Sequence, residues 1–212
     1  MKAMSPKKKY IAISAVFLLM LIVYCKVSYH GYKKNSGTMP EKEINISKVI
    51  EEARNLKGML YDPLQGQFGN IGGKLGFIVC IDVPLIAYQN AGYSIRQAME
   101  TDFFKHPEHY NIKNGNTPGN PYFSRRARNL YDYCKGNNKF ISLDKNPQIG
   151  DVVFYRSKQD VSVSHIALIS IVKSNNSYWV IEAYPVFTAE LSNSKVEKRG
   201  WIPVAFGRIK SN

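Results

Sequence analysis

Cysteine is scarce in this 212-residue chain, which has only Cys25, Cys80 and Cys134. So few cysteines exclude a disulfide-rich scaffold, and their odd number leaves two alternatives open. One is a Cys80–Cys134 disulfide in an oxidising compartment, and the other is a free, reactive thiol beside two inert ones. A chain of this length with 44% hydrophobic residues buries a sizeable core without cross-links.

Long apolar segments are also few, since the 16 residues from Tyr10 to Cys25 form the only such run. A polytopic membrane protein is therefore excluded. As a helix the run is about 24 Å long, against a hydrocarbon core of about 30 Å, so Lys9 and Lys26 must snorkel. No small-residue cleavage site follows it. We expect residues 1–27 to be an uncleaved signal anchor in the inner (cytoplasmic) membrane, with secretion after cleavage as the alternative.

Acidic residues are outnumbered, 16 against 29 basic ones, which gives a net charge of +13. About half of the excess lies in residues 1–35, which hold seven lysines and no acid. The cluster Lys7–Lys9 places the N-terminus in the cytoplasm and the following domain in the periplasm or outside the cell. The rest of the charge suits an anionic polymer, although a solvated basic surface explains it equally. No nucleic-acid-binding signature is present, so we expect no nucleic-acid partner.

The remaining sequence predicts a polar linker over residues 28–44 and one domain over residues 45–212. Apolar periodicity and helix-stop residues predict the earlier elements as helices, and β-branched or aromatic runs predict the later ones as strands. The helices are expected over 47–57, 80–91, from Ser94 onward and over 124–135, and the strands over 151–155, 165–172, 178–184 and 204–209. Helices followed by strands indicate an α+β fold with an antiparallel sheet packed against helices.

Cys80 is the first candidate catalytic residue. Pro84 is tolerated only in the first turn of a helix, so the helix is expected to begin near Cys80 to Asp82. The thiol would then lie at a helix N-terminus, where the helix dipole favours the nucleophilic thiolate. A cysteine that is merely buried is the alternative.

His165 and Glu182 are the candidate partners of that thiol. His165 begins a strongly apolar strand and is placed to accept the thiol proton as a general base. Glu182 lies inside another apolar strand, where a carboxylate is costly unless it is paired. In antiparallel neighbouring strands, Glu182 would reach the far ring nitrogen of His165 and orient it. The alternatives are a core histidine and a solvent-facing glutamate, with Asn175 and Asn176 as substitutes for the third group.

Other motifs carry weaker signals. His106 and His109 lack further ligands at metal-binding spacing, and no Gly-Lys-Ser/Thr follows the glycines of 66–76, so we expect no metal and no cofactor. Cys134 shares an apolar helix face and is expected to pack. The run from Arg125 to Arg128 either binds a carboxylate or phosphate or forms a solvated helix face.

The order of these motifs resembles the NlpC-type papain-like cysteine peptidases of bacteria, and it is most similar to the bacterial domain of unknown function 1287. The resemblance covers about residues 57–209. It rests on Tyr61-Asp62-Pro63, Cys80-Ile81-Asp82-Val83, Asn129-Leu130, Gly150-Asp151-Val152-Val153 and His165-Ile166.

This resemblance implies a papain-like fold in which Cys80 is the nucleophile, His165 the base and Glu182 the orienting group. It also implies that Tyr61, Asp62 and Asp82 line the oxyanion region or the substrate cleft. The usual Asp-Cys-Ser-Gly sequence is absent, and the charge of Asp82 should disfavour a thiolate unless helix N–H groups neutralise it.

The resemblance further implies an exported or membrane-anchored cysteine amidase that cleaves amide bonds of peptidoglycan peptides through an acyl-enzyme. Two alternatives remain at this point. One is a lipid esterase or acyltransferase on the same fold, and the other is an inactive domain that binds the cell wall or a partner.

Overall fold

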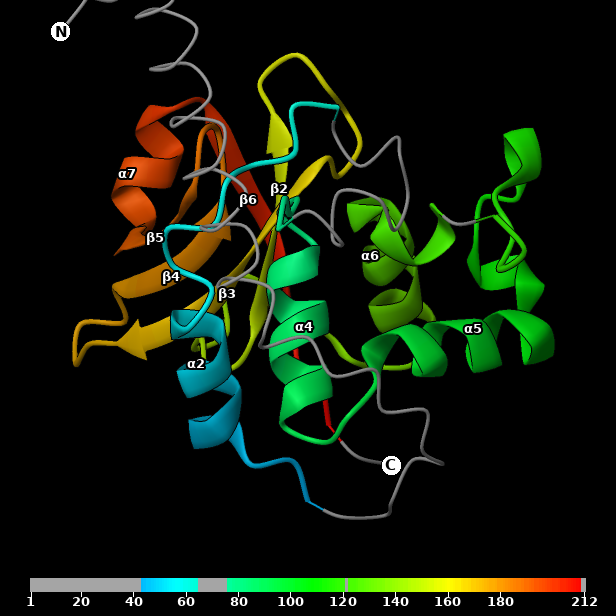
Figure 1. Cartoon of the computed structure of the whole chain (residues 1–212), viewed down its shortest axis with the longest axis horizontal. Coiled ribbons are helices and arrows are strands. Elements are labelled where there is room, and N and C mark those ends of the chain that lie inside the picture. The colour runs from blue at the N-terminus through cyan, green and yellow to red at the C-terminus, as the bar shows by residue number, and fades with distance from the viewer. Residues whose placement is uncertain (1–42, 65–75, 121, 211–212) are drawn as a thin grey trace, which may run out of the picture.

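The computed structural model of the chain describes residues 43–64, 76–120 and 122–210 (Figure 1). The expected signal anchor over 1–27 lies outside these residues, as do nearly all of the expected linker and most of the glycines of 66–76. Within the described part of the chain, no helix is long and apolar enough to cross a membrane.

Six antiparallel strands form one sheet in the order β1-β6-β2-β3-β4-β5 (Figure 1). Their bounds are β1 Phe140–Ile141, β2 Val152–Ser157, β3 His165–Val172, β4 Tyr178–Ala183, β5 Thr188–Ser192 and β6 Trp201–Gly207. The central strand β3 is buried from its first residue to Ser170, which explains why its sequence is a continuous apolar run rather than an alternating one. The predicted α+β class and antiparallel sheet are confirmed.

Helices from the first half of the domain cover one face of the sheet (Figure 1). They are α2 Ile46–Arg54, α4 Asp82–Asn90, α5 Ile95–Lys105 and α6 Ala127–Gly136. A large apolar core on this face joins residues such as Tyr88, Leu130 and Leu168. The short helix α7, Asn193–Lys198, packs on a second, smaller core that includes Tyr155 and Val196. The sheet therefore separates two hydrophobic cores.

The helix boundaries follow from local hydrogen bonds. The Ser94 hydroxyl accepts from the Gln97 N–H at 3.2 Å, as the predicted cap of α5 requires. Helix α4 begins at Asp82, within the expected start between Cys80 and Asp82, whereas the start predicted for α6 at residue 124 was wrong by three residues. Cys80 and Ile81 form a turn before α4, and the 3-10 turn η3 (Phe123–Arg125) precedes α6.

Three elements have no counterpart in the sequence prediction. Strands β1 and β5 are short, and only Val196 is buried in α7, so none of them shows a clear apolar period. Between α5 and α6, the described residues form three 3-10 turns. These are η1 Pro107–His109, η2 Lys113–Gly115 and η3.

Candidate active site

Cys80 lies in a tight turn that leads into α4. The Val79 N–H donates to Asp82 Oδ2 and the Asp82 N–H donates to the Val79 carbonyl, each at 2.9 Å. These two reciprocal bonds enclose Cys80 and Ile81, whose own backbone N–H groups donate to no acceptor within the described residues. The thiol is 8% exposed and lies just before the helix rather than in its first turn.

His165 is the first residue of β3, and Glu182 holds its ring from the neighbouring strand β4. The strands pair antiparallel with Leu168 opposite Ile181, which brings Glu182 to the strand end where His165 begins. His165 Nε2 lies 2.6 Å from Glu182 Oε2, and both side chains are almost completely buried. The contact expected between these two residues is therefore present.

The Cys80 thiol lies beside His165, because its interaction with the ring is one of the causes that raise the pKa of this histidine. Because Nε2 faces Glu182, Nδ1 is the ring nitrogen left for Cys80. Burial alone would lower the pKa of His165. The hydrogen bonds to Cys80 and Glu182, and the charges of these groups, outweigh burial and raise that pKa to about 9. The imidazole is therefore held in an environment that favours its protonated form.

Two residues that the sequence did not single out complete this arrangement. Arg199, which follows α7, donates through Nη1 to Glu182 Oε1 at 2.5 Å, so the buried carboxylate faces a cation as well as the imidazole. Trp201 stacks on the His165 ring with a centroid distance of 4.6 Å. Neither residue has a local sequence signal, because their contacts join segments that are separate along the chain.

Asp82 is neutralised by a cation rather than by helix N–H groups. Arg125 donates through Nε to Oδ1 at 3.0 Å and through Nη2 to Oδ2 at 2.5 Å. Asp62 Oδ2 lies 3.9 Å from the same guanidinium. The expected conflict between Asp82 and a thiolate at Cys80 is therefore offset by Arg125, and the cost of burying Asp82 was the signal that a cation must be near.

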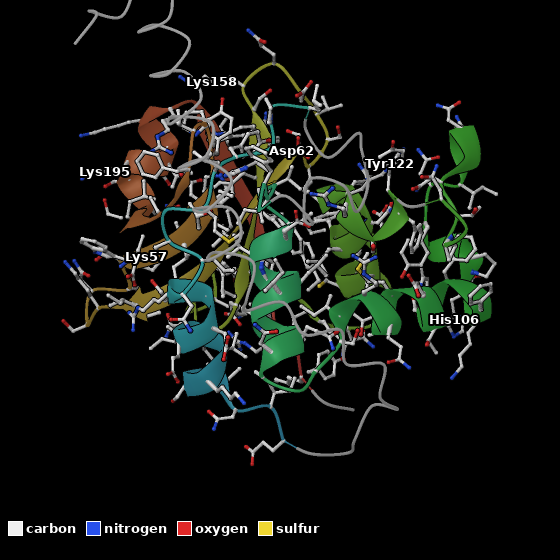
Figure 2. The ribbon with its side chains drawn as sticks, in the orientation of Figure 1. Lys57, Asp62, His106, Tyr122, Lys158 and Lys195 are labelled. Carbon is white, nitrogen blue, oxygen red and sulfur yellow. The ribbon has the colours of Figure 1, made fainter. Side chains whose placement is uncertain are left out.

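Tyr61 also lies beside Cys80. Burial raises the pKa of its hydroxyl, and the negative charges of Cys80, Tyr184, Asp62 and Asp82 raise it further. Its ring meets that of Tyr184 edge-on, with a centroid distance of 5.8 Å. Among the described residues, Tyr61 and Cys80 line one pocket of about 280 Å³. Figure 2 shows Asp62 near the N-terminal end of α4, on the same side of the molecule as Tyr122, which precedes the turn η3.

The remaining candidates lie elsewhere. Cys80 and Cys134 are both free, so the disulfide that the sequence left open is not formed. Cys134 is fully buried, and burial raises the pKa of its thiol, as expected of a packing residue. Asn175 and Asn176 form the exposed turn between β3 and β4 and do not approach His165.

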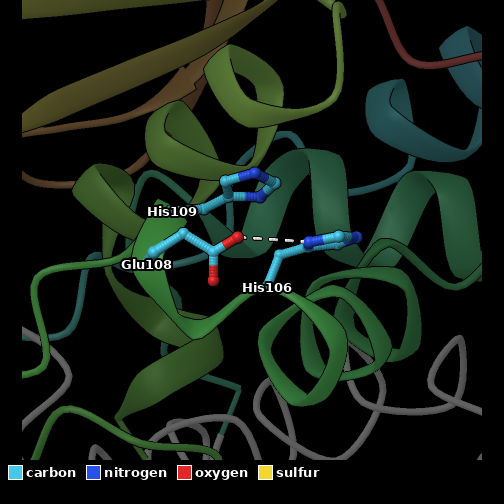
Figure 3. Close-up of side chains that lie close together, drawn as sticks. All are labelled: His106, Glu108 and His109. Carbon is cyan, nitrogen blue, oxygen red and sulfur yellow. Dashed lines mark hydrogen bonds and ion pairs between the residues drawn. The ribbon is translucent and has the colours of Figure 1, made fainter.

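A second group of polar side chains lies at the end of α5. Ligand atoms of His106, Glu108 and His109 all lie within 4.8 Å of one another (Figure 3). His109 Nδ1 is also 3.0 Å from the buried Asp102. The sequence analysis identified no further ligand at a suitable spacing and did not consider Glu108, which lies between the two histidines. Figure 2 places His106 far from Asp62, so this group is separate from Cys80.

Comparison with known proteins gives one match. A family model described as "Domain of unknown function (DUF1287)" matches residues 61–192, which is more than half of the chain. The matched range includes Cys80, His165, Glu182 and the Asp82–Arg125 pair. No curated protein and no solved structure matches the chain.

Proposed function

The chain belongs to the DUF1287 family, and from this premise we propose that its domain is a papain-like cysteine hydrolase of the NlpC type. The observation that carries the proposal is the contact of Cys80 with His165, whose other ring nitrogen is held by Glu182. A thiol, a base beside it and an acid that orients the base are the three groups that acyl transfer requires. The match to the family model spans all three of these residues.

In the proposed reaction, the Cys80 proton moves to His165, and Cys80 Sγ attacks the carbonyl carbon of an amide. The C–N bond then breaks, the leaving amine takes the proton from His165, and a thioester remains on Cys80. Water gives a proton to His165 and attacks the thioester, which releases a carboxylic acid and restores the thiol. Glu182 stabilises the imidazolium in both steps, and Arg199 balances the charge of Glu182.

The oxyanion of each tetrahedral intermediate needs donors near Cys80. The backbone N–H groups of Cys80 and Ile81 are available for this role, because neither donates to an acceptor in the described residues. The raised pKa of Tyr61 keeps its hydroxyl protonated and therefore able to donate.

We propose peptidoglycan peptides as the substrate, with residues 1–27 anchoring the domain outside the cytoplasm. The net positive charge of the chain suits this polymer, because its peptides carry carboxylates. A lipid esterase would be favoured by an apolar cleft lined by tyrosine and phenylalanine. Among the described residues, the pocket at Cys80 holds Tyr61 but no phenylalanine, and three arginines line it. An inactive binding domain would be favoured by burial of Cys80 or by its pairing with Cys134. Cys80 is unpaired but buried, so the structure meets one of these two conditions.

The test is digestion of purified peptidoglycan by the full chain, with Cys80→Ala as the matched control. Soluble products are identified by mass spectrometry. New peptide-stem fragments that require Cys80 would support the proposal and identify the bond. If the two proteins release the same products while both remain folded, the peptidoglycan amidase is rejected.

A further inference from the structure

We propose that the pocket beside Cys80 binds a carboxylate of the substrate through Arg126 and Arg128. This inference rests on the proposed function, because a carboxylate bound there belongs to the molecule whose amide faces Cys80. It deepens that function by naming the group that the enzyme recognises next to the bond it cleaves.

All charged side chains among the described residues that line the pocket are positive. The polar and aromatic side chains around it are those of Tyr61, Cys80, Arg125, Arg126, Arg128 and Ser164. No acidic side chain is among the described residues that line it. A concave site with three guanidinium groups and a nucleophile favours an anionic ligand over a neutral or cationic one.

The three arginines differ in whether an acidic side chain of the protein already neutralises their charge. Arg125 is buried against Asp82 and is 3.9 Å from Asp62, so its charge is largely committed to the turn that holds Cys80. The Arg126 side chain is exposed, and its guanidinium forms no ion pair or hydrogen bond with another described residue, although its backbone carbonyl accepts from the Asn129 N–H. Its guanidinium is therefore available to a ligand that enters the pocket.

Arg128 already forms one ion pair, but its remaining N–H groups donate to no acceptor among the described residues. Its Nε donates to Asp132 Oδ1 at 2.9 Å, and its guanidinium lies 5.7 Å from the centre of the Tyr131 ring. These two contacts fix the direction of the side chain and use one of its five N–H groups. The side chain is 47% exposed, so the remaining N–H groups can bind a carboxylate in the forked geometry that arginine favours.

The fold of α6 does not by itself account for these two cations. Arg126 is the N-cap of α6 and Arg128 lies in its first turn. The helix dipole disfavours positive charge at this end, so both arginines cost stability where they are. A bound carboxylate compensates that cost, which is the pattern expected of residues kept for recognition rather than for folding.

The test compares the reactions of Cys80 with iodoacetate and iodoacetamide, which deliver groups of similar size but different charge. Rates for the full chain are followed by mass spectrometry of the Cys80 peptide and divided by the rates for N-acetylcysteine. We expect the corrected ratio to favour iodoacetate by about tenfold, the effect of one charge-assisted hydrogen bond. In the Arg126→Gln, Arg128→Gln double variant the ratio should fall close to one. The Lys195→Gln, Lys198→Gln double variant, which removes the same number of positive charges on α7, should leave it unchanged.

The outcomes that overturn the inference are specific. A corrected ratio near one, an equal loss in the Lys195→Gln, Lys198→Gln variant, or no reaction of Cys80 with either reagent would each reject a carboxylate site. Stronger inhibition of the iodoacetate reaction by inorganic phosphate than by acetate would assign the pocket to phosphate instead. If the iodoacetate preference holds but peptidoglycan is not cleaved, the proposed function fails and the carboxylate site stands.

Discussion

Asp82 and Arg125 form a buried, two-point ion pair, with N–O distances of 3.0 and 2.5 Å, beside the turn that carries Cys80. The side chains are only 9% and 4% exposed. Asp82 Oδ2 also accepts from the Val79 N–H, so one carboxylate connects the start of α4, the turn before it and the turn η3. The position of the thiol therefore depends on a contact between residues 43 positions apart.

Asp82→Asn is expected to destabilise the domain by about 3 kcal/mol, because Arg125 would remain buried without its main counter-charge. The free energy of unfolding measured by urea titration checks this. Asp144→Asn is the matched control, since Asp144 and its partner Lys145 are exposed, and its effect should lie within about 0.5 kcal/mol. Equal effects of the two variants would contradict a structural role for the Asp82–Arg125 pair.

The stability of the domain is expected to fall between pH 6.5 and pH 9 through His165. Its pKa is raised to about 9 in the folded chain, so the protonated ring stabilises the fold. This contribution is complete below the unfolded pKa of about 6.5 and is lost as the pH rises through 9, about 3 kcal/mol in all. Urea titrations at several pH values measure it. In His165→Gln, the free energy of unfolding should not show this loss between pH 6.5 and pH 9. An equal loss in both proteins would show that His165 is not its cause.

Cys80 and Cys134 are expected to differ in reactivity toward iodoacetamide at pH 7. Cys80 lines a pocket and contacts a base, whereas Cys134 is fully buried with a raised pKa. The native chain should therefore be modified at Cys80 at least about tenfold faster than at Cys134. Mass spectrometry of the two peptides gives both rates. In denaturant the difference should disappear, and if it persists there, it does not come from the fold.

Gly207→Ala is expected to destabilise the domain by about 1–3 kcal/mol. A Cβ at this position of β6 would lie 2.7 Å from the Phe154 ring and 2.8 Å from Cys134 Sγ, and both side chains are fully buried. Thermal unfolding measures the loss. Gly119→Ala is the control, since a Cβ there would have no atom within 4 Å, and a loss as large as that of Gly207→Ala would show that the contacts are not the cause.

The sequence predicted those parts of the fold that depend on local patterns. The cap at Ser94, the bounds of the strand that begins at His165 and the antiparallel pairing that brings Glu182 to His165 all follow from short-range signals. The buried carboxylate of Glu182 was informative because its cost demanded a partner nearby.

The partners that balance the buried charges could not be predicted in the same way. Arg125 reaches Asp82, and Arg199 reaches Glu182, across segments whose relative placement is fixed only by the packed fold. The pattern around Arg125 also fits a solvated helix face, and Arg199 follows a helix with one buried residue. A charge pattern alone does not distinguish a buried arginine from an exposed one, because the difference arises from tertiary contacts.

The separation of two hydrophobic cores by the sheet has a consequence for when the thiol becomes reactive. Cys80 belongs to the core under α4, whereas Tyr155 and Trp201, which flank His165, belong to the core under α7. If only one of the two cores has packed, only one of the two residues, Cys80 or His165, is held in place. In the proposed mechanism the thiol would therefore become reactive only when folding is complete, so a nascent chain would carry an unreactive Cys80 until both cores have packed on the sheet.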